Sequence, residues 1–251
     1  MSVVLLAGDG DSTWIVHNAL RERFPISAVI VEEAPPAVGV LSRRARRLGW
    51  PTVVGQVAFI MFARLTERFS KTRRDEILRE HGLSRIRSTT AVTRVDSANS
   101  GAVIEMLQSL DPRVVVINGT RILSEEILTC IDAPFINVHA GITPMYRGVH
   151  GCYWALASSD PSHAGVTVHL VDSGVDTGGV IAQAVVLPSA NDSYHTYPFL
   201  QLAAGIPLLV QAIRDALEGQ LRTIDVDGES RLHYHPTIWR YAANRLRLGV
   251  R

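Results

Sequence analysis

An asparagine and a histidine two positions apart follow a run of apolar residues in the middle of the chain. In "FINVHAGITPMYRGVHGCYWAL", residues 135–156, Asn137 and His139 point to the same face of an extended chain, because side chains alternate along a strand. The segment "GVTVHLVDSGVDTGGVIAQ", residues 165–183, adds Asp176 in a glycine-rich loop. A carboxylate raises the pKa of a neighbouring imidazole and fixes its orientation, while an amide donates a neutral hydrogen bond. These three residues predict a site that stabilises negative charge on oxygen as an external nucleophile attacks a carbonyl carbon.

The other reactive residues favour neither a covalent intermediate nor a metal site. No activated serine is evident, and Cys152 lacks a clear activating partner, which favours direct transfer. The histidines between 139 and 169 are scattered, without the short spacings or thiolates of structural zinc, so no metal is expected. His169 is expected either to support the site through Asp176 or Thr167, or to be a core histidine bonded to the backbone.

Runs of β-branched residues alternate with helical patterns, which is typical of an α/β protein. The expected fold is a Rossmann-like, mostly parallel sheet with helices on both faces and right-handed crossovers. Strands are expected at 3–7, 26–31, 114–118, 135–138, 165–171 and 180–187. Helices are expected at 12–23, 99–109, 124–129, 149–158 and 194–217, with one or two more between 55 and 80. Because ligands of such sheets bind beyond the carboxyl ends of the strands, Asn137 and His139 should lie at the ligand site.

Composition argues against several classes of function. The chain has 251 residues, and its 47% hydrophobic and 20% charged content is typical of a globular protein. Its formal net charge of +1 predicts no general attraction to nucleic acid. Two cysteines, Cys130 and Cys152, and no signal-peptide pattern after Met1 suggest a cytoplasmic protein without a disulfide framework. The apolar stretch at 53–63 is too short to span a bilayer.

The loop after the first expected strand, in "LLAGDGDSTW", resembles a nucleotide-binding turn only in part. It has two glycines but carries Thr13 where a dinucleotide fingerprint needs a third, which disfavours a Rossmann cofactor site. Asp9 and Asp11 oppose a phosphate there. Two interpretations stay open: a tight turn with Asp11 or Ser12 as the N-cap, and a loop that positions substrate.

Taken together, the ordered motifs resemble a known family. The Asn-x-His pair, Pro144, "YRG" at 146–148, "GVTVH" and "VDTGGVIAQ" look like the formyltransferases that use 10-formyltetrahydrofolate. That family includes glycinamide ribonucleotide transformylase, methionyl-tRNA formyltransferase and the sugar N-formyltransferases. The similarity covers residues 89–188 well, and the first strand with its loop weakly.

The resemblance implies a role for each motif. Asn137, protonated His139 and Asp176 would be the catalytic trio, with 10-formyltetrahydrofolate as co-substrate and an amine as the attacking group. The residues implied on the folate side are Asn118, Arg121, Ile122, Leu123, Val171 and Asp172. The residues expected on the acceptor side are Gly10, Asp11, Ser12, Tyr146, Arg147 and Gly148, and the alternative role for Tyr146 and Arg147 is in packing and backbone contacts.

The expected acceptor is a small-molecule amine, an amino sugar or sugar nucleotide. The aromatic residues on which its base would stack are Trp14, Tyr153, Trp154 and Tyr194. The alternatives are a phosphoribosylglycinamide formyltransferase, a formyltetrahydrofolate hydrolase, and a non-catalytic folate-binding or membrane-associated relative. Methionyl-tRNA is disfavoured, because the chain is short for that enzyme's extra β-domain and its charge predicts no tRNA surface.

A helical, basic insertion is expected at about 55–90 within a catalytic domain of residues 1–220. Its apolar residues are more continuous than a one-sided stripe requires. Phe59, Met61 and Phe62 are therefore expected at a homodimer interface or on an exposed apolar patch, with an anionic membrane surface as the second choice of partner.

The tail, residues 221–251, is expected to form a C-terminal capping segment. A short strand or turn at "LHYHP" and a helix over 237–247 are expected in it. His233 and His235 either belong to this cap or reach the acceptor pocket.

Overall fold

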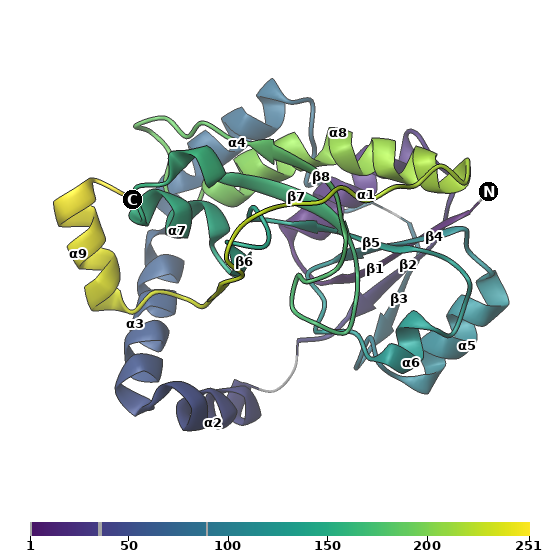
Figure 1. Cartoon of the computed structure of the whole chain (residues 1–251), viewed down its shortest axis with the longest axis horizontal. Coiled ribbons are helices and arrows are strands. Elements are labelled where there is room, and N and C mark those ends of the chain that lie inside the picture. The colour runs from purple at the N-terminus through teal and green to yellow at the C-terminus, as the bar shows by residue number, and fades with distance from the viewer. Residues whose placement is uncertain (1, 35–36, 89) are drawn as a thin grey trace.

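A seven-stranded sheet forms the centre of the computed structural model, which describes residues 2–34, 37–88 and 90–251 (Figure 1). In sheet order the strands are β3 (Val92–Val95), β2 (Ile26–Glu32), β1 (Val3–Gly8), β4 (Val114–Asn118), β5 (Phe135–His139), β7 (Gly165–Leu170) and β8 (Val180–Val185). The first five are parallel, whereas β7 and β8 run antiparallel to their neighbours. The predicted α/β fold with a mostly parallel sheet is confirmed.

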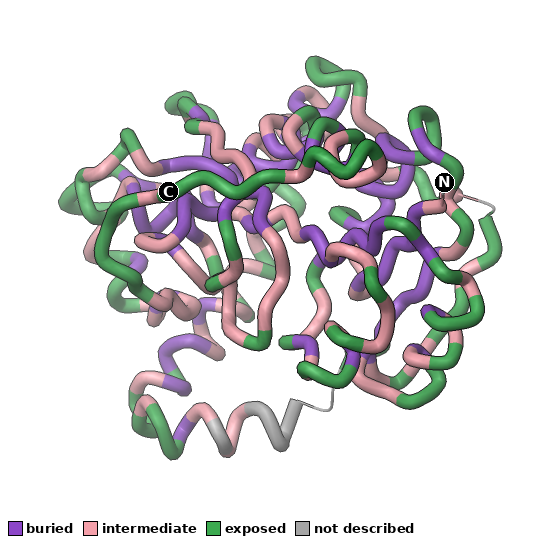
Figure 2. Tube along the Cα trace, turned by 45° about the vertical axis from the view of Figure 1, so that its right-hand side comes forward, coloured by how far each residue is buried: buried purple, intermediate pink, exposed green. Residues whose placement is uncertain are grey.

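Helices cover both faces of the sheet, because its strands are apolar on both sides. These helices are α1 (Asp11–Arg21), α5 (Gly101–Leu110), α6 (Glu125–Leu128) and α8 (Tyr197–Leu217). On β1, Val3, Leu5 and Ala7 share a core cluster with α1 and α8, and Val4 and Leu6 share one with α5 and α6. Figure 2 shows the resulting buried centre. Of the described helices, only α8 is long and apolar enough to cross a membrane, and its contacts with the sheet identify it as a core helix.

One strand and the first residues of two helices differ from the prediction, for reasons that lie in the local sequence. Helix α7 (Gly151–Ala157) lies within the helix predicted at about 149–158, and it begins only after His150, whose φ of 60° is not helical. Helix α8 begins at Tyr197 rather than 194, and Pro198 lies in its first turn, where a missing N–H costs nothing. Strand β3 was not predicted. It is a four-residue edge strand whose central side chains, Thr93 and Arg94, are exposed.

A second helical region lies beside the sheet, with α2, α3 and α9 at the left of Figure 1. Its members are α2 (Ala37–Leu48), α3 (Trp50–Thr66), the 3-10 turn η1 (Glu67–Ser70) and α9 (Ile238–Leu248), whereas α4 (Lys71–Glu80), which follows η1, packs against α8. The region predicted at 55–80 thus contains two helices joined by η1. Helix α3 begins earlier than predicted, directly after Gly49, which has φ of 82°. Helix α2 was not predicted.

Phe59 lies in a cluster of aromatic residues, so its predicted place on the surface is wrong. Its ring centroid is 5.1 Å from that of Tyr194 and 5.4 Å from that of Tyr241, and only 1% of the residue is exposed. Phe62 is half-buried against Tyr241, whereas Met61 is exposed. The turn of the helix explains the difference, because positions 59 and 61 point about 160° apart around its axis.

The C-terminal residues pack back onto the segment that follows β5. Strand β9 (Leu232–His233) pairs in parallel with β6 (Arg147–Gly148), and the indole N–H of Trp154 donates to the Tyr234 carbonyl at 2.9 Å. The His233 ring stacks on Tyr146 and Trp154. His235 lies 3.0 Å from His150, nitrogen to nitrogen. Both tail histidines therefore make packing or hydrogen-bond contacts with the residues that follow β5.

Candidate active site

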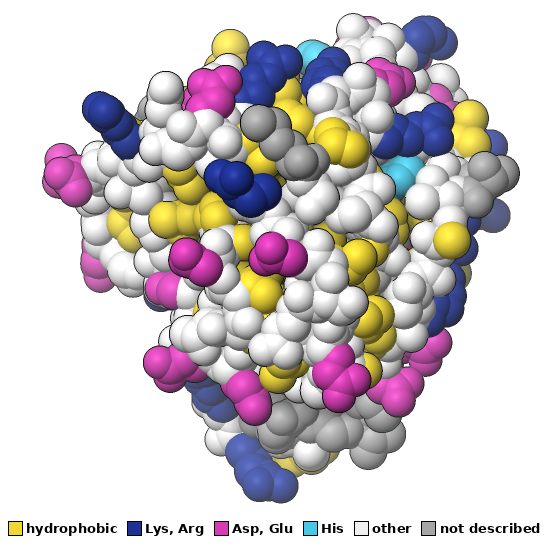
Figure 3. Space-filling model, turned by 90° about the vertical axis from the view of Figure 1, so that its right-hand side faces the viewer, with side chains coloured by type: hydrophobic (Ala, Val, Ile, Leu, Met, Phe, Trp, Pro, Cys, Tyr) yellow, Lys and Arg dark blue, Asp and Glu magenta, His cyan; other side chains and the backbone are white. Residues whose placement is uncertain are grey.

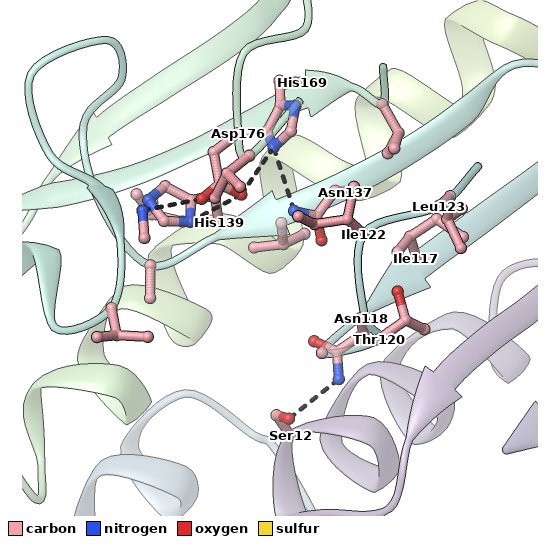
Figure 4. Close-up of a pocket in the computed structure, with 18 of the residues that line it drawn as sticks. Ser12, Ile117, Asn118, Thr120, Ile122, Leu123, Asn137, His139, His169 and Asp176 are labelled. Carbon is pink, nitrogen blue, oxygen red and sulfur yellow. Dashed lines mark hydrogen bonds and ion pairs between the residues drawn. The ribbon is translucent and has the colours of Figure 1, made fainter. Parts of the chain in front are cut away.

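A cavity of about 460 Å³ opens at the carboxyl ends of β4 and β5 (Figure 4). Its polar wall includes Asn137, His139, His169 and Asp176, and its apolar wall includes Ile117, Leu123, Val171 and Leu202. Neighbouring antiparallel strands β5 and β7 place residues distant in sequence opposite each other. The predicted trio is therefore brought together at the predicted edge of the sheet.

His139 is held from both ring nitrogens. Its Nε2 lies 2.8 Å from the Tyr146 carbonyl oxygen, and its Nδ1 lies 3.3 Å from Asp176 Oδ1. The second carboxylate oxygen of Asp176 accepts the Gly148 N–H at 2.9 Å. With Nε2–H donating to the carbonyl, Nδ1 of the neutral ring has no proton and faces the carboxylate.

The protonation of His139 differs from the sequence-based expectation. Burial lowers its pKa, and the opposing effects of Asp176 and the Tyr146 carbonyl do not offset that cost. The pKa of Asp176 is also lowered: burial alone would raise it, but its interactions with His169, His139 and the Gly148 N–H outweigh burial. Burial thus shifts His139 toward the neutral imidazole, whereas the sequence predicts an imidazolium.

His169 lies directly behind Asn137. The two residues are cross-strand partners on β5 and β7, and Asn137 Nδ2 is 3.1 Å from His169 Nε2. Since His169 Nδ1 is 2.6 Å from the Leu170 carbonyl, Nδ1 carries the proton and Nε2 accepts from the Asn137 amide. His169 Nε2 also lies 3.7 Å from Asp176 Oδ1. These contacts favour the expectation that His169 supports the site over the expectation of a core histidine bonded only to the backbone.

All six residues assigned to the folate side border the cavity. Asn118 donates from Nδ2 to Ser12 Oγ at 3.0 Å, so its amide is held at the end of β4. Arg121 is half-buried and held in place, because its guanidinium pairs with Glu32 and donates to the Asp96 carbonyl at 2.8 Å. Its backbone N–H donates to Glu32 as well, at 2.9 Å. The loop from Asn118 to Leu123 is thus a fixed wall.

The acceptor-side loop borders a neighbouring cavity of about 390 Å³. Gly10 lines this second cavity and Ser12 lines both. Asp11 is exposed and pairs with Arg85 at 2.9 Å. The N-cap of α1 is Gly10, without a side-chain cap, so the predicted capping by Asp11 or Ser12 is wrong.

Three arginines near this loop were not anticipated. Besides the Arg85–Asp11 pair, Arg87 lies 2.9 Å and Arg94 3.2 Å from the Asp9 carboxylate. They come from the segment after α4 and from β3, more than 70 residues away in sequence. No local sequence pattern pairs them with the glycine loop.

Tyr146 and Arg147 make packing and backbone contacts, the alternative to acceptor contacts, and neither is among the described residues that line the main cavity. The Tyr146 hydroxyl donates to Asp160 at 2.8 Å, and burial together with that bond raises its pKa to about 12. Arg147 donates to the Val175 carbonyl at 2.9 Å, which ties β6 to the Asp176 loop. Gly148 does line the cavity, beside Asp176.

The aromatic residues predicted to stack on an acceptor base are all buried. Trp14, Tyr153, Trp154 and Tyr194 each expose 6% or less of their surface. They are core residues, so this prediction is wrong.

Two other features bear on the chemistry. Burial raises the pKa of the Cys152 thiol to about 12, so this cysteine is not an activated nucleophile. Within the described part of the chain, no group of three or more His, Cys, Asp or Glu residues is arranged to hold a metal ion.

Known proteins are similar to this chain in amino-acid sequence. A family model described as formyl transferase matches residues 62–213. The methionyl-tRNA formyltransferase of Caldanaerobacter subterraneus is 32% identical over 124 residues, which are 49% of this chain and 40% of that protein. The same enzyme from Synechococcus sp. strain JA-3-3Ab is 37% identical over 138 residues, 55% of this chain and 41% of that protein. The matches thus span about two fifths of the length of these relatives.

Solved structures show the same fold over more of the chain. A sugar N-formyltransferase from Shewanella sp. matches 93% of this chain and 76% of its own, with a TM-score of 0.57 and 13% identity. Glycinamide ribonucleotide transformylase 1 from Symbiobacterium toebii matches 89% of this chain and 93% of its own, with a TM-score of 0.56 and 23% identity. The N-formyltransferase of Helicobacter canadensis, solved with folinic acid and dTDP-3-aminofucose, matches 93% and 71%, with a TM-score of 0.56 and 16% identity.

Proposed function

The chain belongs to the formyl transferase family, and on that premise we propose that it transfers the formyl group of 10-formyltetrahydrofolate to the primary amine of a small molecule, an amino sugar or sugar nucleotide. The observation that carries this proposal is the grouping of Asn137, His139 and Asp176 on one wall of the main cavity. A neutral base, an amide donor and a carboxylate are the groups that acyl transfer to an amine requires.

In the proposed mechanism, His139 Nδ1 takes the proton from the amine, directly or through a water, as nitrogen bonds to the formyl carbon. The carbonyl electrons move to oxygen, to which Asn137 Nδ2–H donates, while the new Nδ1–H faces Asp176. Asp176, 3.3 Å from Nδ1, stabilises the imidazolium. The bond from the formyl carbon to the folate nitrogen then breaks, and His139 returns the proton to that nitrogen. Burial disfavours the imidazolium in the site without substrate. His139 is therefore expected to lower the energy of the transition state more than that of the bound substrate.

Replacement of His169 by alanine is expected to lower kcat about 10- to 100-fold, because the Asn137 amide loses the acceptor that sets its rotation. The KM for folate should change less. His169→Gln should recover part of kcat, since its amide oxygen can accept from Asn137. A merely structural role would lower the melting temperature of both variants and leave kcat close to that of the parent.

The charged residues of the second cavity favour an acceptor that places no phosphate at the loop containing Gly10 and Ser12. Asp9, Glu32, Glu33 and Arg121 line it, and Arg121 is paired with Glu32. Arg87 and Arg94 are paired with the Asp9 carboxylate. Because these cations are already paired with carboxylates, this loop offers a weak site for the phosphate of glycinamide ribonucleotide.

An acceptor panel tests this proposal. Purified protein with 10-formyltetrahydrofolate would be offered amino-sugar nucleotides, glycinamide ribonucleotide and methionyl-tRNA, with a sample lacking acceptor, and formylated products would be identified by mass spectrometry. We expect product with an amino-sugar nucleotide. Formylation of glycinamide ribonucleotide or methionyl-tRNA alone would contradict the acceptor class. Formate released without an acceptor would identify a hydrolase instead.

A further inference from the structure

One face of α3 exposes a row of large apolar side chains. Trp50, Val54, Met61 and Leu65 expose 65%, 59%, 59% and 72% of their surface. At about 100° per residue these positions fall within roughly 60° around the helix axis, and the row is about 22 Å long. The buried residues of α3, including Val53 and Phe59, point to other directions. This row is therefore an outward face that no described element covers.

Helix α9 borders this row. The indole of Trp239 packs on Gly55 so closely that a Cβ there would lie 2.3 Å from Trp239 Cη2, yet Trp239 is 54% exposed. Leu246, seven residues later on the same side of α9, is also exposed. We call these six residues the α3–α9 surface: Trp50, Val54, Met61, Leu65, Trp239 and Leu246.

The charge around the α3–α9 surface is mostly positive, and Glu67, the acidic residue next to the row, is paired with Arg74. Residues 37–66 contain five arginines and no Asp or Glu, and α9 contains three arginines and no Asp or Glu. Arg64 and Arg68 are exposed near the end of the row. The other end of the molecule differs: on that side Figure 3 shows acidic side chains as well as basic ones, among apolar and neutral atoms. The positive charge is thus concentrated at the α2–α3–α9 end, although the chain as a whole is nearly neutral.

This charge decides between the possible partners. A symmetric dimer through the α3–α9 surface would bring arginines against arginines, and like charges facing each other oppose association. An anionic bilayer supplies the opposite charge and also accepts apolar side chains. Exposed tryptophan, leucine and arginine on one helical face are the residues typical of a helix lying in the headgroup region of a membrane.

We propose that the α3–α9 surface binds the surface of an anionic lipid bilayer. Trp50, Met61 and Leu65 enter the headgroup region, and the flanking arginines contact lipid phosphates. None of the described residues that line the main cavity belongs to α2, α3 or α9, so the bound lipid leaves the catalytic groups in place. The apolar sequence of α3 favoured a homodimer, and the distribution of charge reverses that preference.

Cosedimentation with vesicles tests the proposal independently of formyl transfer. We expect binding to vesicles of phosphatidylcholine with phosphatidylglycerol, little binding to phosphatidylcholine alone, and loss of binding at high salt. Met61→Glu/Leu65→Glu should weaken binding at least tenfold, and Arg64→Gln about fivefold. The matched controls are Ile86→Glu and Arg113→Gln, at exposed positions outside α2, α3 and α9, and both should bind like the parent.

Several outcomes would overturn the proposal. These are absence of binding to anionic vesicles, equal binding to neutral ones, and equal losses in the control variants. A dimer in light scattering that Met61→Glu/Leu65→Glu converts to a monomer would show that a second copy covers this surface. Circular dichroism and melting temperature would confirm that each variant is folded, and formyl transfer without lipid should be unchanged in all of them.

Discussion

Replacement of His139 by glutamine is expected to lower kcat for formyl transfer by about 10²- to 10⁴-fold, the usual contribution of a positioned general base. Glutamine retains a donor for the Tyr146 carbonyl but has no atom that accepts the proton of the amine. Folate binding should change little, because His139 acts mainly on charge that develops in the transition state. Single-turnover rates together with a folate binding titration would measure both quantities.

The control for this variant is His81→Gln, which removes an exposed histidine at the end of α4. It should retain the kcat of the parent protein. The assignment of His139 would be wrong if His139→Gln kept turnover within a few-fold of the parent, or if its rate fell only in proportion to lost folate binding.

The free energy of unfolding is expected to fall steeply between about pH 7 and pH 5, and the His150–His235 pair contributes much of that fall. The two rings share a hydrogen bond of 3.0 Å that exists only while at least one of them is neutral. Burial, with the nearby His235 and His195, lowers the pKa of His150 from 6.5 to about 3, and burial with Arg44 lowers that of His235 to about 4. Neither ring therefore protonates readily in the folded protein.

The sign of this pH dependence follows from the number of protons that the folded and the unfolded chain bind. Below the ordinary pKa of 6.5 the unfolded chain binds protons at both positions, while the folded protein does not until about pH 4 for His235 and about pH 3 for His150. Stability is therefore complete above pH 6.5 and is lost as the pH falls toward these folded values. Between about pH 7 and pH 5 each group costs about 2 kcal/mol.

Urea unfolding of His150→Gln/His235→Gln at the two pH values measures this contribution. The difference in unfolding free energy between about pH 7 and pH 5 should be smaller than in the parent by about 4 kcal/mol, and His235→Gln alone should remove about half of that. The comparison is made within each variant, so a change in its stability at neutral pH does not enter. Equal pH dependence in the parent and the double variant would show that the pair is not responsible.

Local patterns in the sequence determined most of the sheet and the identity of the central residues. The β-branched runs at Val114–Asn118 and Gly165–Leu170 are strands because such residues pack well on pleated, doubly covered surfaces. The two-residue period alone placed Asn137 and His139 on one face. Strand β3 lacked such a signal, because it is too short for a clear alternation. Helix α2 did carry one, since Val38, Leu41, Ala45 and Leu48 recur at helical spacing between the arginines, and the prediction missed it.

Only the tertiary structure decided how the site residues are connected and charged. The register of β5 against β7 puts His169 opposite Asn137, and no spacing along the chain records that register. The same holds for Arg87 and Arg94 on Asp9. Tyr146 lies inside the family motif, yet its side chain turns to Asp160 while its carbonyl holds His139.

The protonation of His139 also depends on the folded state. A carboxylate neighbour can be inferred from sequence and predicts a raised pKa, but the cost of burying the ring is larger and lowers it. Likewise, the apolar sequence around Phe59 predicted an exposed patch without showing which side chains α9 and Tyr194 would cover. The physical reason is common to these cases: residue types and periods are local properties, whereas burial, register and net protonation arise from segments that meet only when the chain folds.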